Sequence, residues 1–331
     1  MKTGLTLGKF APLHHGHQAV IERALAECDS VMVMIYHAPE FTQVPLEVRA
    51  GWIRKLYPSI HIIECRDGPM EVGDTPEIRA MHEEYILRVL DGRPITHFYS
   101  SEFYGDHVSR ALGAQDCRVD EARQLVPISA TQIRDDPYRH RQFVDPLVYR
   151  DLVTWVVLVG APSTGKTTLC ASLAARFNTV WMPEYGREYW EAHQHQRRLT
   201  PEQLVEIAVG HREREDRLVH EAREYFFVDT DASTTTVFAD YYHGQPAAAL
   251  RELADQTPQR YDLCLLCDDD IPYDDTEDRS GEANRADMQQ RVLDELHRLG
   301  RQYVTLRGSL DERIAEVERV LAKFDKWRAE A

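Results

Sequence analysis

Short apolar runs alternate with amphipathic stretches through the first half of the chain. Runs of strand length are found at Thr3–Gly8, Val31–Tyr36, His61–Cys65, Thr96–Ser100 and Asp116–Val119. Helical spacing of apolar residues is found between them, at Gln18–Glu27, Pro45–Tyr57, Pro76–Leu90 and Gly105–Leu112. This β-α-β-α order predicts a doubly wound parallel sheet, whose ligands bind at the carboxyl ends of the strands.

The second half contains another set of strand-like runs. They are found at Thr154–Val159, Thr179–Met182, Tyr225–Asp229, Tyr261–Cys267 and Gln302–Leu306. Capping boxes that begin at Thr200 and Ser309 predict the starts of two helices. With 331 residues, the chain is long enough for two α/β domains, each with its own core.

Composition narrows the classes of function. The formal net charge of −16 disfavours a nucleic-acid-binding surface, which needs a basic face. No apolar stretch approaches membrane-spanning length, and no signal peptide is expected before the first strand. Six scattered cysteines predict a reduced, cytoplasmic protein. Cys264 and Cys267 lie on opposite faces of a predicted strand, which favours core packing over a metal site.

A histidine and glycine motif follows the first predicted strand. The run from Gly8 to His17 reads G-K-F-A-P-L-H-H-G-H, at a junction where backbone N–H groups and a helix dipole favour phosphate. We expect this run to grip a triphosphate and stabilise charge at phosphorus. Its candidate residues are Gly8, Lys9, Phe10, His14, Gly16 and His17.

A second phosphate motif follows the strand-like run that ends at Val159. The sequence from Gly160 to Thr167 has the form G-x-x-x-x-G-K-T, whose glycines let backbone N–H groups point at phosphates. Lys166 adds positive charge, and the Thr167 hydroxyl can ligate Mg²⁺. The expected ATP-binding residues are Gly160, Ser163, Thr164, Gly165, Lys166, Thr167 and Thr168.

Two further segments extend these sites. Ser129 and Thr131 begin a short helix that carries Arg134 one turn later, which predicts a clamp for the triphosphate. Asp229 ends an apolar strand and is expected to support Mg²⁺. If that strand continues, Asp231 lies on the same face.

The histidine motif, G-x-F-x-P-x-H-x-G-H, and the segment I-S-x-T-x-I-R that ends at Arg134 together resemble the nucleotidyltransferase superfamily. Their combination with a P-loop resembles the bacterial NadR family. Family-like segments in the first half are Tyr99–Glu102 and Asp120-x-x-Arg123. In the second half they are Glu184–Glu188, Gly210-His211, Phe227–Asp231 and Asp278-Arg279-Ser280. Some NadR proteins carry an amino-terminal DNA-binding domain, which we do not expect in this chain.

The resemblance implies a Rossmann-like nucleotidyltransferase domain at residues 1–148 and a P-loop NTPase-type kinase domain at residues 149–331. The kinase would convert nicotinamide riboside and ATP to nicotinamide mononucleotide (NMN), and the first domain would convert NMN and ATP to NAD. ATP and Mg²⁺ are the implied cofactors. Tyr99, Asp120 and Arg123 would contact the nucleotide.

Several roles are assigned by position. Glu184, at the end of the second strand of the kinase, is the first choice for its base, and Asp231 is the second. Arg279 and Arg285 lie within or beside an acidic loop. They could be lid residues that close over the phosphates, or they could be ordinary surface arginines. The expected contacts of the pyridine nucleotide are Arg49, Trp52, Tyr185 and Arg187.

Other functions stay open at this point. The first domain could adenylylate another phosphorylated acceptor, such as pantetheine phosphate. The P-loop domain could be an ATP sensor or a kinase for a different small substrate. The expected partners are nicotinamide riboside, NMN, ATP and NAD, with neither nucleic acid nor membrane insertion, and a homo-oligomer is left open.

Overall fold

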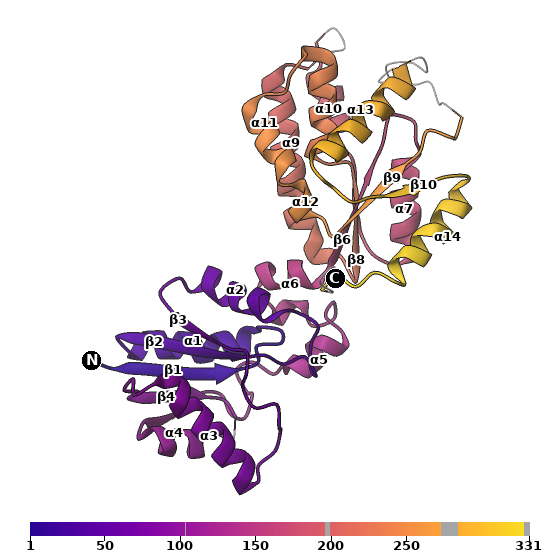
Figure 1. The fold of residues 1–331 in the computed structure, drawn as a ribbon. Coiled ribbons are helices and arrows are strands. Elements are labelled where there is room, and N and C mark those ends of the chain that lie inside the picture. The colour runs from indigo at the N-terminus through magenta and orange to yellow at the C-terminus, as the bar shows by residue number, and fades with distance from the viewer. Residues whose placement is uncertain (103, 196–198, 273–283, 328–331) are drawn as a thin grey trace. The chain divides into compact units, whose positions relative to one another are not determined.

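The chain folds into two compact units in a computed structural model that describes residues 1–102, 104–195, 199–272 and 284–327. One unit contains Met1–Tyr149 together with Trp327, and the other contains Arg150–Lys326. Each unit has a five-stranded sheet in which every strand pair is parallel. The expected α/β architecture with two parallel sheets is confirmed (Figure 1).

The first sheet has the strand order β3-β2-β1-β4-β5. Its elements are β1 (Thr3–Gly8), α1 (His15–Glu27), β2 (Ser30–Tyr36), α2 (Leu46–Leu56), β3 (His61–Cys65), α3 (Pro76–Leu90), β4 (His97–Ser100), α4 (Gly105–Leu112), β5 (Gln115–Arg118), α5 (Ala130–Asp135) and α6 (Pro146–Leu152). The order reverses at β1, which pairs with β2 on one side and with β4 on the other. Such a switch point opens a crevice beyond the carboxyl ends of these strands.

The second sheet has the strand order β10-β9-β6-β8-β7. Its elements are β6 (Thr154–Val159), α7 (Lys166–Arg176), β7 (Trp181–Met182), α8 (Tyr185–His193), α9 (Pro201–Leu218), β8 (Tyr225–Asp229), α10 (Ala232–His243), α11 (Ala248–Asp255), α12 (Thr257–Arg260), β9 (Leu263–Cys267), α13 (Arg285–Arg298), β10 (Val304–Leu306) and α14 (Leu310–Leu321). The phosphate motif therefore follows the central strand, β6.

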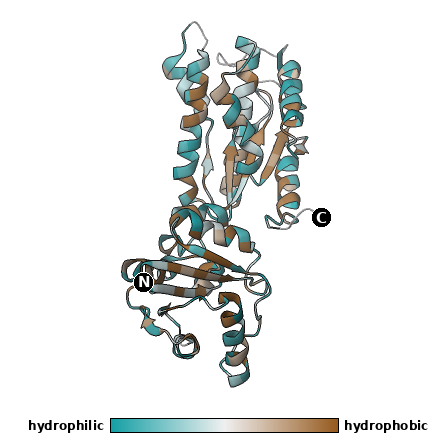
Figure 2. Ribbon diagram, turned by 60° about the vertical axis from the view of Figure 1, so that its left-hand side comes forward, coloured by the Kyte–Doolittle hydropathy of each residue, from teal (hydrophilic) through white to brown (hydrophobic). Residues whose placement is uncertain are grey.

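The core of each unit forms on the faces of its sheet. Leu5, Met34 and Phe98 are buried in the first unit, and Val156 and Phe227 in the second. Figure 2 shows hydrophobic residues concentrated in the strands, while the helices alternate between hydrophobic and hydrophilic positions. This distribution is the expected one for parallel sheets that are covered on both faces by helices.

Helix starts follow the sequence signals. Thr200 and Ser309 form the expected capping boxes of α9 and α14. All six cysteines are free, and Cys264 and Cys267 are buried in β9, as the core-packing interpretation predicted. Among the described residues, no helix is both long enough and apolar enough to cross a bilayer.

Candidate functional site

The turn after β1 brings an aromatic ring against the histidine motif. Phe10 has a left-handed φ of 47° and a buried side chain. Its ring meets the ring of His17 edge-on, with 5.0 Å between centroids. The turn therefore leads into α1, and the Phe10 ring packs against His17 in the first turn of that helix.

His14 and His17 cap this helix reciprocally. The Gly16 N–H donates to His14 Nδ1 at 3.1 Å, and the His14 N–H donates to His17 Nδ1 at 3.4 Å. Both Nδ1 atoms accept, so each neutral ring carries its proton on Nε2. Burial lowers the pKa of His14 to about 4 and holds the pKa of His17 well below its usual range. A Cβ on Gly16 would lie 2.9 Å from the His14 ring, so the motif requires glycine there.

Two cationic side chains flank the histidines. Lys9 Nζ lies 3.2 Å from the centroid of the Phe41 ring and 3.5 Å from a Glu40 oxygen. Arg134 Nη1 donates to the Ala11 carbonyl at 2.6 Å. Arg134 thereby ties α5 to the loop after β1.

The second helix start is arranged as the sequence suggested. Ser129 caps α5, and the Thr131 hydroxyl accepts from Arg134 Nη2 at 3.0 Å. Arg134 and Ala11, which lies within the histidine motif, are 123 residues apart in sequence. Their hydrogen bond brings α5 and the histidine motif into one site.

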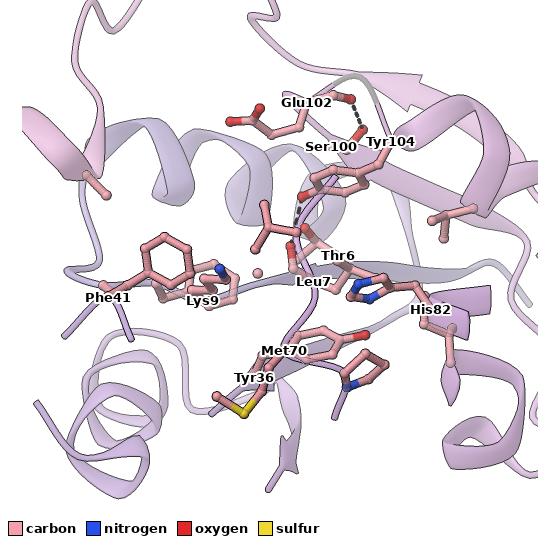
Figure 3. A pocket seen from close by; sticks show the side chains of 18 of the residues that line it. Thr6, Leu7, Lys9, Tyr36, Phe41, Met70, His82, Ser100, Glu102 and Tyr104 are labelled. Carbon is pink, nitrogen blue, oxygen red and sulfur yellow. Dashed lines mark hydrogen bonds between the residues drawn. The ribbon is translucent and has the colours of Figure 1, made fainter. Parts of the chain in front are cut away.

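Some of these groups border a cavity of about 400 Å³, whereas His14, Ser129 and Thr131 are not among its lining residues. Its lining comes from the carboxyl ends of β1, β2 and β4 and includes Lys9, Phe10, His17, Tyr36, Tyr104 and Arg134. Gly8 also lines it, and a Cβ there would lie 3.4 Å from the Phe10 ring. Figure 3 shows Lys9 beside Phe41 on one side of the cavity and His82 on the other. The site therefore combines phosphate-binding groups with space for a small molecule.

Three residues expected at the ligand are instead buried in the fold. Trp52 is 1% exposed and does not line the cavity, so it offers no ring face to a pyridinium. The buried guanidinium of Arg49 donates to the carbonyls of Val44, Tyr36 and Lys9. Arg49 therefore ties the chain after β1 and the end of β2 to the segment before α2.

Tyr99 is also corrected by the structure. Its side chain is fully buried, and its hydroxyl donates to Glu27 Oε2 at 2.9 Å, at the far end of α1. A tyrosine in β4 alternates faces with its neighbours, and this one faces the core.

Asp120 and Arg123 have different surroundings. Asp120 accepts from the backbone N–H groups of Gln124, Leu125 and Val126, so it shapes a loop. Arg123 is half exposed, pairs with Glu102 at 3.2 Å, and lowers the pKa of His14 and His17 by its positive charge. Arg123 therefore lies within electrostatic reach of the phosphate site.

The phosphate loop of the second unit needs its glycines. Gly160 has φ of 143°, and a Cβ there would lie 2.6 Å from the Cys267 carbonyl oxygen in β9. Gly165 has φ of 80°, and Ser163 also has a positive φ, of 60°. The backbone can follow this path only where side chains are absent or small.

The charged and hydroxyl groups of the loop are satisfied internally. Lys166 Nζ donates to the carbonyls of Gly160 and Ala161 at 3.0 and 2.8 Å. Thr164 Oγ1 donates to the Ala161 carbonyl at 2.8 Å. Thr168 is an exposed residue in the first turn of α7. The loop is thus curled, with its lysine folded back on it.

Two residues that the motif did not reveal hold this loop from outside. Gln289 in α13 accepts from the Ala161 N–H at 2.8 Å and donates to the Cys267 carbonyl at 3.2 Å. The buried Arg313 donates to the Thr164 carbonyl at 2.6 Å. No local sequence signal marks them, because their role depends on contacts 128 and 149 residues away.

A buried carboxylate lies beside the phosphate loop. Thr167 Oγ1 donates to Asp229 Oδ2 at 2.6 Å, while Asp229 Oδ1 has no hydrogen-bond partner among the described residues. Burial, followed by the negative charge of Glu184, raises the pKa of Asp229 to about 6. An oxygen without a partner on such a carboxylate suits a divalent cation, and Mg²⁺ in phosphate sites needs only one or two carboxylates. The residues present therefore fit Mg²⁺.

The structure separates the two candidate bases. Glu184 lies at the N-terminus of α8, close enough to Asp229 to raise its pKa. Asp231 is the N-cap of α10, accepts from the Ser233 N–H at 2.9 Å and pairs with Arg301 at 2.5 Å. Thr230 has φ of 69° and β8 ends at Asp229, so the condition under which Asp231 would share a face with Asp229 is not met.

The structure describes three of the four remaining residues that were expected to contact ligands. Tyr185 has Arg214 over its ring at 3.8 Å, and Arg187 is exposed in α8. Arg285 begins α13 with a buried side chain that donates to the Ile271 carbonyl at 2.7 Å, so it is not a surface arginine. Arg279 lies outside the described residues.

A buried histidine supports the helix that carries Tyr185. His211 Nδ1 accepts from the Tyr185 N–H at 3.5 Å, and its Nε2 lies 3.2 Å from Glu215. Glu215 is fully buried and also binds Arg260 and the Tyr261 hydroxyl. No local sequence signal marks this role of His211, because it depends on contacts with Tyr185 and Glu215.

Two known protein families match separate parts of the chain. Residues 5–136 match the family described as Cytidylyltransferase-like, and residues 155–313 match the AAA domain family. The chain is 28% identical over 292 residues to the "Trifunctional NAD biosynthesis/regulator protein NadR" of Salmonella typhimurium (strain LT2) and 29% over 293 residues to that of Escherichia coli (strain K12). Each match covers 82% of this chain and 70% of the relative.

Solved structures show the same fold. A crystal structure of NadR protein in complex with NAD and AMP-PNP matches with a TM-score of 0.56 at 24% identity, over 100% of this chain and 98% of that one. A crystal structure of NadR protein in complex with NR matches with a TM-score of 0.57 at 24% identity, over 96% and 95%.

The lowered pKa of His14 makes a prediction about stability. His14 titrates near 6.5 when unfolded and near 4 when folded, so its neutral form stabilises the fold above pH 6.5. That contribution falls by about 3 kcal/mol as the pH decreases to 4. His14→Asn keeps a helix-capping side chain but has no such titration. Urea unfolding at pH 7 and 4.5, followed by intrinsic tryptophan fluorescence, should therefore show a smaller loss of stability at acid pH in the variant. An equal loss in both proteins would contradict the assignment.

Proposed function

The chain belongs to the NadR family, and on that premise we propose that it is a bifunctional enzyme of NAD salvage. The second unit phosphorylates nicotinamide riboside with ATP, and the first unit adenylylates the resulting NMN with a second ATP to give NAD and pyrophosphate. One observation carries this proposal. A separate phosphate-binding turn follows the central strand of each sheet, so the chain has two nucleotide sites.

We assign residues 1–148 to the adenylyltransferase and residues 149–331 to the kinase. The compact units Met1–Tyr149 and Arg150–Lys326 support this assignment. We further propose that the enzyme works in the cytoplasm, uses Mg²⁺ with ATP and binds no nucleic acid. The six free cysteines support a reducing compartment, and the net charge of −16 disfavours a nucleic-acid partner.

Adenylyl transfer needs charge stabilisation more than a base. The acceptor phosphate is already anionic, so its oxygen attacks the α-phosphorus directly while the bond to the bridging oxygen of pyrophosphate breaks. His17 lines the cavity, although its ring also hydrogen-bonds the Pro12 backbone, and His14 stacks on it; we propose that both imidazoles stabilise the phosphates, with positive charge from Lys9 and Arg134. The N-terminus of α1 adds its dipole. Preorganised groups of this kind act by positioning and electrostatics.

His17→Ala should reduce NAD synthesis from NMN by roughly 10²–10³-fold, the usual loss when a preorganised charge stabiliser is removed. His15→Ala is the matched control, since His15 is on the same helix but does not line the cavity. Steady-state assay of pyrophosphate release measures both. Phosphorylation of nicotinamide riboside should persist in both variants. Near-normal NAD formation in His17→Ala would remove His17 from the transfer step.

Phosphoryl transfer in the second unit needs a proton acceptor. The 5′-hydroxyl of nicotinamide riboside loses its proton as its oxygen attacks the γ-phosphorus, and we propose that Glu184 accepts it. Lys166 leaves the loop carbonyls to bind the β- and γ-phosphates. Thr167 and Asp229 would hold Mg²⁺, which supplies neutralising charge to the phosphates.

Substitutions of the two carboxylates should have different effects. Glu184→Gln keeps the shape but cannot accept a proton, so kcat should fall by about 10²–10⁴-fold while riboside affinity changes little. Asp231→Asn breaks a buried ion pair and should destabilise the unit by about 3 kcal/mol or more. Turnover, riboside binding and thermal unfolding distinguish these outcomes. Normal turnover in Glu184→Gln would exclude Glu184 as the base.

A further inference from the structure

One buried polar group in the cavity of the first unit has no part in the transfer chemistry. Tyr36, at the carboxyl end of β2, lines the cavity and is 6% exposed. Its hydroxyl is screened from water and has no hydrogen-bond partner within the described part of the chain. Leaving a buried hydroxyl unpaired costs folding free energy. A ligand that pairs with this hydroxyl would explain why the group is there.

The Tyr36 ring is held from several sides. A Cβ on Gly68 would lie 2.7 Å from Tyr36 Cδ1, so the chain at Gly68 passes close to the ring. The rings of Tyr85 and His82 pack against it, with centroids 5.8 and 6.2 Å away. Arg49 fixes the backbone by donating to the Tyr36 carbonyl at 3.0 Å. The position of the hydroxyl is therefore built by the fold.

The distribution of charge orients an acceptor in this cavity. Lys9 and His17 lie at one end of the cavity, whereas the other part of the lining combines the apolar side chains of Met70 and Ile86 with the polar or charged ones of Glu71, Arg79, His82 and His107. Figure 3 shows Tyr36 between Lys9 and His82. A nucleotide with its phosphate at the end with Lys9 would extend its nicotinamide ring, a pyridinium cation, toward the aromatic side chains around Tyr36.

We propose that the Tyr36 hydroxyl is a specificity-determining group that donates a hydrogen bond to the carboxamide oxygen of the acceptor ring. The assignment rests on the proposed function, because it takes NMN as the acceptor. A site built to pair with a polar substituent discriminates against analogues that lack it. The ligand reaches the hydroxyl by displacing the loop at residues 69–73, where Met70 and Val72 are 53% and 69% exposed. Few contacts hold such a loop.

The test compares two acceptors in Tyr36→Phe. One is NMN, and the other is the same nucleotide with hydrogen in place of the carboxamide. The value of kcat/KM should fall roughly tenfold for NMN, as expected for one lost hydrogen bond, and stay unchanged for the second acceptor. The KM for ATP should not change. The Tm should not fall, because the unliganded protein loses no hydrogen bond.

Two other variants keep the test specific. Tyr85→Phe removes a neighbouring hydroxyl that donates to Asp67 at 2.9 Å and does not line the cavity, so the preference for NMN should persist. Gly68→Ala retains the Tyr36 hydroxyl but displaces its ring, and it should reproduce the loss of preference. An unchanged preference in Tyr36→Phe, or equal losses for both acceptors, would overturn the assignment. A wild-type protein that forms no NAD from NMN would contradict the proposed function itself.

Discussion

Backbone crowding beyond one strand of each sheet is the constraint on which both sites depend. The chain leaves β1 and β6 and turns within a few residues into a helix, whose N-terminus is the positive end of the helix dipole. In the second unit, Gly160 passes so near the Cys267 carbonyl that no Cβ fits. In the first, Gly16 leaves room for the His14 ring that caps the helix. Each turn thus places the positive end of a helix dipole where it favours phosphate.

Both sites hold groups whose ionisation is shifted by burial or whose polar atoms a ligand can engage. Burial keeps the His14 and His17 imidazoles neutral, and it raises the pKa of Asp229 to about 6. Lys166 binds carbonyls of its own loop, an arrangement that phosphate oxygens can replace. Stability given up at such positions is a common cost of function. Burial of apolar side chains in the two surrounding cores offsets this loss of folding free energy.

Local pattern and motif were sufficient for much of the fold. Strand runs such as Thr3–Gly8 and Tyr225–Asp229 agree with the structure because buried parallel strands need continuous apolar sequence. The capping boxes at Thr200 and Ser309 also agree, since capping is a contact between residues three apart. The helices at Ala232–His243 and Ala248–Asp255 were not predicted.

Tertiary packing decided what the sequence could not. Trp52 and Tyr99 have the residue types of ligand contacts, but the sheet turns both into the core. Asp231 leaves the face of Asp229 because Thr230 adopts a left-handed conformation. Gln289 acquires its role from a contact with the phosphate loop, which is distant in sequence. Tyr36 acquires its role from its place in the lining of the cavity. No spacing in the chain marks either residue.

The stoichiometry of products from nicotinamide riboside and Mg-ATP tests the division of labour most directly. The account predicts one ADP and one pyrophosphate for each NAD formed, with NMN rising before NAD. Lys166→Ala should form neither NMN nor NAD from the riboside, yet should still make NAD from supplied NMN. NAD formation from the riboside without ADP, or loss of NAD formation from NMN in Lys166→Ala, would contradict the assignment of one reaction to each unit.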